Sequence, residues 1–446
     1  RFHLILFAGN PMLKAKVRDF KARVVSLNNL VPQDNFYRTL ETKLNLSFVR
    51  DLVQQHYSTR MGRPSIDPVV FFKLQLIMFF EGSRSERQLM EMVNLNLAFR
   101  WYIGYDLDEK VPDHSSLSKI RDRYGLEIFQ GFFEKIVELC IEAGLVWGKE
   151  LYFDGTKIRA NASLDSMVDR WYWQAKEHIE ELFPEVVEQP AISNRFVSKY
   201  DGTRMTGRRA KTYKRTADIK ISSTDPDASP MQRFNGDRAK LGYHTHYVVD
   251  GGKSRIILAS LTTPASIMDN TPMLDLVRWV RFRWQLQPDI AVGDTKYGTI
   301  ANISGLEKDG IRTYTAMTDT QKRTKYYTMD DFKYDAGNDK YICPQGYDLP
   351  LWSRRKSESV FVYRADYKVC SACPVKSKCT GSKSGRHIFR PFEQEYLDRV
   401  KGYHETVHYK KAMRKRKVWV EPLFGEAKQW HQMRQFRLRR LRKVNV

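Results

Sequence analysis

Long apolar runs are missing from this sequence. The longest, residues 69–80, is interrupted by Lys73 and Gln75 and is too short to cross a bilayer, so we expect a buried helix there and no membrane association. Cysteine is also scarce, with five residues in a chain of 446. Four of the five lie close together, which excludes the disulfide framework of a small secreted domain.

Acidic residues are few relative to basic ones. The chain has 52 Asp and Glu against 75 Lys and Arg, a net charge of +23. This surplus predicts a polyanionic partner, because each phosphate contact releases bound counterions. A basic protein without a nucleic-acid role is the alternative interpretation. The hydrophobic content of 42% is typical of a globular chain, and the length allows two or three domains.

Helical periodicity dominates residues 46–146, whereas residues 1–45 show no regular pattern. Asp67 and Pro68 predict a helix start, Ser85 and Gln88 predict a capping box, and a third helix is expected from Asp113. The basic residues here favour a DNA-binding domain and the solvated faces of a helical bundle about equally. They are Arg60, Arg63, Arg84, Arg87, Lys119, Arg121 and Arg123.

From residue 147 onward, the pattern changes to strands followed by acids. Buried strands at 151–153 and 290–292 precede Asp154 and Asp294, and a last helix over about 414–435 carries Glu421. Carboxylates at the carboxyl ends of strands gather at one edge of an α/β sheet. Phosphodiester transfer needs divalent ions held by such ligands, so we expect these three acids to bind Mg²⁺ or Mn²⁺.

Glu426 competes with Glu421 for the third position. Glu421 and Lys428 are seven residues apart and share a helix face, so Lys428 could hold a phosphate beside a metal bound by Glu421. Glu426 has no basic residue seven positions later. We therefore expect Glu421 to be the ligand.

Most of the cysteines lie in a β-leaning segment, residues 317–412, which we interpret as an insertion in a catalytic domain at 147–446. Four thiolates there could form a tetrahedral site for structural Zn²⁺. Unmetallated thiols and an iron–sulfur cluster remain alternatives, and His387 could replace one cysteine. The four residues are Cys343, Cys370, Cys373 and Cys379.

Other polar and aromatic residues have ordinary structural interpretations. His244 and His246 alternate on a strand, and ordinary strand histidines are favoured over a metal site. We expect Asp250 to shape a hairpin turn, Asp269 to cap a helix and Cys140 to lie in the core. Core packing is favoured over base stacking for three tryptophans: Trp171, Trp173 and Trp430.

Several motifs resemble those of bacterial insertion-sequence transposases of the IS1182 group, within the wider IS4/IS5-like superfamily. The first-aspartate, second-aspartate and glutamate motifs are DGTKIRANAS at 154–163, GDTKYG at 293–298 and VEPLFGEAK at 420–428. Further similar segments are NLAFRW at 96–101, VPDHSSL at 111–117 and STDPDA at 223–228. The resemblance follows the family's order over roughly residues 50–440.

The resemblance implies an α/β fold with a ribonuclease-H-like mixed-sheet catalytic core. The cysteine-rich insertion would interrupt this core, and an all-α domain would precede it. The implied function is that of a DDE transposase, which binds the terminal inverted repeats of its element as double-stranded DNA and performs cleavage and strand transfer. A homodimer on DNA and a location in the bacterial cytoplasm, at the nucleoid, are also implied.

One family signature is only partly kept. The related IS4 signature has Tyr and Arg seven and four residues before the glutamate and Lys seven after it. Here these positions hold Arg414, Lys417 and Lys428, which we expect to contact DNA. A domesticated DNA-binding protein of the same fold, a nuclease without strand transfer and an RNA-binding protein remain as alternatives.

Overall fold

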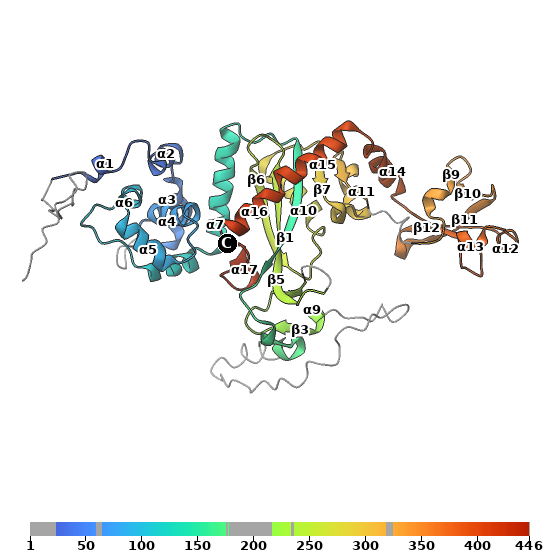
Figure 1. Ribbon diagram of the computed structural model, residues 1–446, viewed down its shortest axis with the longest axis horizontal. Helices are drawn as coiled ribbons and strands as arrows, with labels where there is room; N and C mark the ends of the chain where they lie inside the picture. Colours follow the sequence, from blue (N-terminus) through green and yellow to red (C-terminus); the bar gives the residue numbers. More distant parts are fainter. Residues whose placement is uncertain are drawn as a thin grey trace, which may run out of the picture. The chain divides into compact units, whose positions relative to one another are not determined.

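The computed structural model describes residues 24–58, 65–174, 177, 216–232, 236–317 and 324–445. Arg60 and Arg63 lie outside these residues. Contacts divide the chain into two compact units, Arg1–Arg123 and Tyr124–Val446, and each is described by itself (Figure 1). Within the described residues, no helix is long and apolar enough to span a membrane.

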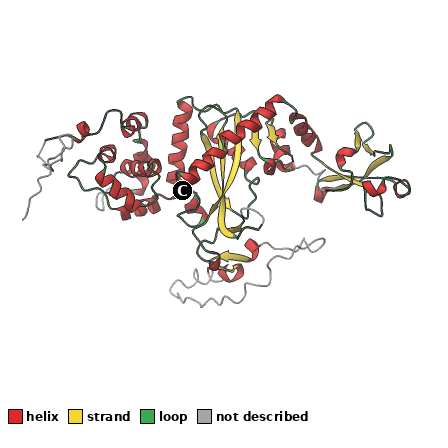
Figure 2. Cartoon of the chain, in the orientation of Figure 1, coloured by secondary structure: helices red, strands yellow, loops and turns green. Residues whose placement is uncertain are grey.

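The first unit is helical (Figure 2). Residues 24–45, which show no regular pattern in the sequence, contain two short helices whose N-caps are Ser26 and Asn35. The expected start at Asp67 is confirmed, since its carboxylate accepts the N–H of Val69 at 2.9 Å. The elements are α1 (Leu27–Leu30), α2 (Phe36–Lys43), α3 (Phe48–Val53), η1 (Gln54–His56), α4 (Pro68–Phe80), α5 (Glu86–Leu95), α6 (Leu97–Ile103) and the first part of α7 (His114–Glu142).

Helix α7 is broken at Gly125, whose φ of +64° and ψ of −169° are not helical. The break ends the helix that the sequence predicts from Asp113, and it lies next to the boundary between the units. Some basic residues before it have structural partners. Arg121 pairs with the buried Glu86, and the buried Arg100 donates to three backbone carbonyl groups.

The second unit is built on a six-stranded sheet with the order β4-β5-β1-β7-β8, in which β6 also pairs with β5. Its strands are β1 (Glu150–Arg159), β4 (Ser229–Met231), β5 (Lys240–Asp250), β6 (Ile257–Pro264), β7 (Ile290–Gly293) and β8 (Arg312–Thr315). Strands β1, β7 and β8 are parallel, whereas β5 is antiparallel to β1 and to β6. The expected hairpin after Asp250 is confirmed by β5 and β6.

Helices cover both faces of this sheet. On one face, α10 (Met273–Trp284), α11 (Ile300–Lys308) and the second part of α7 pack against alternate strand residues, including Leu151 and Phe153. On the other face, α15 (Val407–Trp419) and α16 (Glu421–Gln429) pack against Tyr152 and Val292. Strand side chains alternate between faces, so Asp154 projects toward α15 and α16.

A second sheet, with the order β13-β12-β11-β10-β9, follows along the chain. Its strands are β9 (Lys333–Asp335), β10 (Lys340–Ile342), β11 (Asp348–Arg355), β12 (Val360–Arg364) and β13 (His387–Pro391). It carries η7 (Met329–Asp331), η8 (Lys356–Glu358), α12 (Tyr367–Ser371) and α13 (Lys376–Cys379), and α14 (Gln394–Tyr403) comes next.

The remaining elements are short. They are the strand pair β2 (Met167–Asp169) and β3 (Lys220–Ser222), the helices α9 (Thr216–Ile219) and α17 (Leu441–Val444), and the 3-10 turns η2 (Leu164–Ser166) and η5 (Thr295–Tyr297).

The helix expected over about 414–435 is wrong as a single element. The structure has α15 and α16 instead, which meet at Val420. Pro422 follows at the start of α16 and has no N–H to continue the hydrogen bonds of α15. The break makes Glu421 the first residue of a new helix.

Candidate active site

The register of the sheet brings Asp154 and Asp294 to neighbouring positions. Strands β1 and β7 pair in parallel up to Tyr152 and Val292, and each aspartate lies two residues beyond that pair. The sequence predicts that the first strand ends at Asp154, which is wrong, because β5 extends the pairing of β1 to Arg159. Asp154 therefore lies within β1, at the point where the shorter β7 has ended.

Arg416 links the first aspartate to the glutamate. Its Nη1 lies 3.4 Å from Oδ2 of Asp154, and its Nη2 lies 3.3 Å from Oε1 of Glu421. The side chains of Arg416 and Asp154 are 11% and 16% exposed, whereas that of Glu421 is 52% exposed. Two acids from distant parts of the chain thus share one largely buried cation.

Burial raises the pKa of Asp154 to about 6, and the charges of Asp294 and Glu421 add to this rise. The Arg416 guanidinium and the N–H of Gly155, which donates to Asp154, oppose it. Mutual repulsion of this kind is expected where carboxylates converge, and it is relieved by a bound cation.

Asp294 is held by the turn that follows β7. It caps η5 and accepts the N–H of Lys296 at 2.8 Å. Tyr297, at the end of that turn, is buried among the core residues beneath β1, and burial together with the nearby carboxylates raises its pKa. A side chain at Gly155 would meet His246 and the Tyr297 hydroxyl, so this face of β1 is closely packed here.

The ammonium group of Lys428 donates to the hydroxyl of Thr156, two residues after Asp154 on β1. Both residues line a cavity of about 440 Å³ along β1. Arg414 and Lys417 are exposed on α15. Glu426 is exposed on α16, and α16 directs Glu421 rather than Glu426 to Arg416.

The C-terminal segment closes the far end of the same strand edge. Arg159 donates its N–H to the carbonyl of Arg434, and Phe436 donates to the carbonyl of Arg159. Asp225 accepts the N–H of Arg440 at 2.8 Å and the hydroxyl of Tyr243 at 2.6 Å. The acids of the STDPDA motif thus hold the segment that borders the cavity, and Asp227 likewise accepts the N–H of Leu441.

Two structural expectations are confirmed or corrected by these contacts. Asp250 does shape its turn, because it accepts the N–H groups of Trp147, Gly148 and Gly252. The expectation that Asp269 caps a helix is wrong: the N-cap of α10 is Pro272, and Asp269 instead pairs with Lys296 and His244.

None of the four expected core residues, Trp171, Trp173, Trp430 and Cys140, is fully buried. Trp171 and Trp430 are exposed, so the core assignment is wrong for both; they lie outside the hydrophobic clusters. Cys140 is half-buried on α7.

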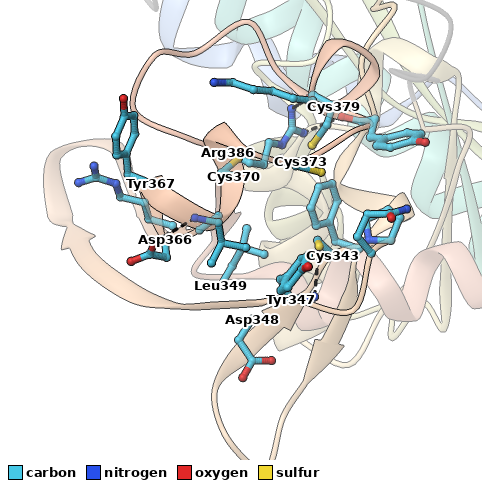
Figure 3. Close-up of a pocket in the computed structure, with 18 of the residues that line it drawn as sticks. Cys343, Tyr347, Asp348, Leu349, Asp366, Tyr367, Cys370, Cys373, Cys379 and Arg386 are labelled. Atoms are coloured by element: carbon cyan, nitrogen blue, oxygen red, sulfur yellow. Dashed lines mark hydrogen bonds between the residues drawn. The ribbon is translucent and has the colours of Figure 1, made fainter.

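The four clustered cysteines line one cavity of about 570 Å³ in the second sheet region (Figure 3). Burial raises the pKa of the Cys379 thiol; Arg386 opposes this rise and the other three cysteines add to it. Cys343 accepts the N–H of Tyr347, as in a tight turn. His387, the alternative ligand, is not among the residues that line this cavity.

Within the described residues, no group of three or more His, Cys, Asp or Glu side chains is arranged so that it could hold a metal ion. In the carboxylate cluster, the guanidinium of Arg416 contacts two of the acids. By ligand type alone, carboxylate oxygens suit a hard divalent cation, and cysteine thiolates suit Zn²⁺.

Sequence reasoning missed Arg416 and the pairing of Asp269 with Lys296. A signal for Arg416 was present, because it falls on the apolar stripe of α15 that contains Tyr409 and Ala412 and would otherwise be buried unpaired. Asp269 offered no such signal, since its partners come from separate strands and turns.

Comparison with known families gives two matches. Residues 25–123 match the Transposase domain (DUF772), and residues 342–446 match the Transposase DDE domain. The first match ends at Arg123, as the first unit does. The second contains Arg416, Glu421 and the four clustered cysteines, but neither aspartate. Searches of curated proteins and of solved structures return no match.

Proposed function

We propose that this transposase binds the inverted repeats of its element and catalyses DNA cleavage and strand transfer. Its two matched domains fit an insertion-sequence DDE transposase, and their pairing is consistent with the IS1182 group. The observation that carries the catalytic part is the convergence of Asp154, Asp294 and Glu421. The parallel register of β1 and β7 supports the pairing of Asp154 with Asp294. The contacts of Arg416 support the pairing of Asp154 with Glu421.

The core that holds these acids is proposed to be ribonuclease-H-like. Three parallel strands, β1, β7 and β8, lie beside an antiparallel β5, and helices cover both faces. The sheet of β9 to β13 falls between β8 and the glutamate helix along the chain, which supports an insertion between the second and third acids. We propose residues 46–146 as the DNA-binding domain and 147–446 as the catalytic domain.

Asp154, Asp294 and Glu421 would hold Mg²⁺ or Mn²⁺. Such ions, when bound, activate the attacking oxygen and stabilise the leaving one. The protein's own part is to keep the carboxylates converged, with Asp154 largely shielded from water. Asp154 must be ionised to act as a ligand, and Arg416 supports that state by its charge.

DNA would be held largely through its phosphates. Lys428 donates to Thr156, two residues after Asp154, and Arg414 and Lys417 extend a basic surface along the exposed side of α15. Such contacts position the strand without reading its sequence. We propose that the helical N-terminal domain recognises the element's ends and that two copies of the chain act together, because two ends must be joined.

We propose that the cysteine cavity holds one structural Zn²⁺. All four thiols line the same cavity, and they come from two separate short segments of the chain. Thiolate formation would be favoured by a bound cation and by Arg386. The cysteine-rich region would then depend on metal for its stability, unlike the large sheet.

The function is tested with supercoiled DNA carrying the element's ends. The full chain should nick and then join these ends in Mg²⁺, and it should do neither in EDTA. Asp294→Ala should bind the DNA as the wild type does but leave it uncut.

Each failure has a separate meaning. Binding without nicking would show a DNA-binding protein that lost its chemistry, and nicking without joining would show a nuclease. Preference for RNA over duplex DNA in a competition assay would overturn the DNA assignment itself.

A further inference from the structure

We propose that Lys296 contacts a backbone phosphate of the DNA strand in the active site, and that Asp269 and His244 form a clamp that keeps Lys296 away from the carboxylates. This inference rests on the proposed function and assigns three residues to it. Asp269 and His244 are positioning residues, because they act through Lys296.

The cavity beside the carboxylates is built to take an anion. It lies along the edge of β1 that β7 leaves uncovered, since β7 pairs only with residues 150–152. Among the described residues that line it, six are basic and two are acidic. The basic ones are Lys157, Arg159, Lys240, Lys296, Lys428 and Arg434, and the acidic ones are Asp237 and Asp269.

The remaining lining residues are Gly155, Thr156 and Met231. None of the described lining residues has an aromatic ring on which a nucleobase could stack, and stacking is the usual way that proteins hold a single base. A phosphodiester fits this lining better than a nucleobase does, because lysine and arginine are the residues that contact DNA phosphates. Gly155 directly follows Asp154, so the phosphate would belong to the strand held at the carboxylates.

The position of Lys296 is set by a chain of short contacts. Its ammonium group lies 2.5 Å from Oδ2 of Asp269, and Oδ1 of Asp269 lies 2.7 Å from Nδ1 of His244. The side chains of Asp269 and His244 are 11% and 7% exposed, whereas that of Lys296 is 63% exposed. The buried carboxylate of Asp269 thus binds the ammonium group at the end of the exposed, flexible Lys296 side chain.

His244 anchors this clamp in the main sheet. It is on β5, opposite Lys157 of β1. The backbone of the clamp is also tied, because Asn270 donates its side-chain N–H to the carbonyl of Lys296 at 2.9 Å. The clamp therefore moves with the strands that carry the active site.

The clamp matters because Lys296 belongs to the second-aspartate motif and is therefore close in sequence to one of the carboxylates. Lys296 is only two residues from Asp294, and its own N–H donates to that aspartate. A lysine on a long, flexible stem can pair with any nearby carboxylate. Without Asp269, the ammonium group would be free to neutralise Asp294 or Asp154 and to compete with a divalent cation.

The phosphate contact is tested by the salt dependence of binding in EDTA, with a fluorescent DNA duplex and the full chain. Lys296→Met should lower the slope of log affinity against log salt by about one unit. The matched control is Lys149→Met, since Lys149 also pairs with an aspartate, Asp289, but precedes β1 at the opposite end of the sheet. An unchanged slope in Lys296→Met would overturn the phosphate contact.

The clamp is tested by Mn²⁺ binding to the DNA-free protein, followed by electron paramagnetic resonance. Asp269→Asn should weaken Mn²⁺ binding roughly tenfold or more, and adding Lys296→Met should restore it. Full-strength binding in Asp269→Asn, or no recovery in the double variant, would overturn the clamp. Absence of Mn²⁺ binding in the wild type would instead contradict the proposed metal site, and the salt slope would still report on Lys296.

Discussion

The candidate active site draws its acids from positions 154, 294 and 421, whereas the cysteine cavity draws four thiols from residues 343–379. The acids depend on the register of β1 with β7 and on a helix that returns to the sheet from the end of the chain. The thiols depend on neighbouring turns and short helices around a small sheet. One cluster is therefore a product of long-range packing, and the other is a product of local geometry.

The two clusters also differ in how charge is balanced. Arg416 bridges Asp154 and Glu421, so the protein itself supplies a cation to the acids. In the cysteine cavity, Arg386 lies close enough to lower the pKa of Cys379, yet burial of the thiol outweighs it. We infer that the active site keeps its shape without metal, whereas the cysteine cavity gains more of its stability from one.

The largest expected effect is confined to the active site. Glu421→Ala should reduce cleavage of supercoiled DNA by roughly 10²–10⁴-fold, because several kcal/mol of charge stabilisation would be lost. Glu426→Ala is the matched control on the same helix and should retain nearly full activity. An inactive Glu426→Ala together with an active Glu421→Ala would show that the third ligand is misassigned.

The next effect should be confined to the cysteine cavity. The wild type should contain about one Zn²⁺ per chain, and replacing both Cys370 and Cys373 by Ser should remove it and unfold this region before the main sheet. Elemental analysis measures the metal, and proteolysis measures which region opens first. The matched control, Cys140→Ser on α7, should keep its zinc.

The prediction would be contradicted by a wild type that contains no zinc and whose cysteine region resists protease as well as its main sheet does. Simultaneous unfolding of both regions in the double variant would instead show that the two clusters are not independent.

A smaller effect should appear in the stability of the metal-free protein. The pKa of Asp154 is raised from 3.8 to about 6, so the folded state favours the protonated acid and loses stability as pH rises through this interval. Asp154→Asn mimics the protonated form and should be more stable than wild type by about 1–3 kcal/mol above pH ~6. The difference should vanish near pH ~4.

Urea unfolding in EDTA at several pH values measures this difference. Asp289→Asn, at the exposed opposite end of the sheet, is the control and should show no such trend. If the difference in unfolding free energy between Asp154→Asn and wild type did not change with pH, burial of the charged Asp154 carboxylate would destabilise the fold only slightly.

The smallest effect of a substitution should be on the salt dependence of DNA binding. For about 6–10 phosphate contacts, affinity should fall by roughly 10³–10⁵ between about 50 and 200 mM salt, and Lys428→Met should lower the slope by about one unit. The double Cys370 and Cys373 variant should keep the wild-type slope if the cysteine region does not hold DNA. A steep loss of slope in that variant would bring the second sheet into the DNA-binding surface.

Local patterns in the sequence predicted much of the first unit and parts of the second. The N-cap at Asp67, the turn at Asp250 and the strand before Asp294 all depend on neighbouring residues, so periodicity and capping rules sufficed. The choice of Glu421 over Glu426 also came from helical spacing, and it stays a prediction that the contact with Arg416 supports.

By itself, the sequence determined the residue types that could bind metal and phosphate, their order along the chain and most of the helices and strands that carry them. Only the tertiary structure decided that β1 continues past Asp154, that Arg416 contacts two acids and that Asp269 holds Lys296. These features depend on partners that come from other strands, helices and turns of the chain. No local pattern encodes such contacts, because they form only when the sheet sets its register and the last helices pack onto it.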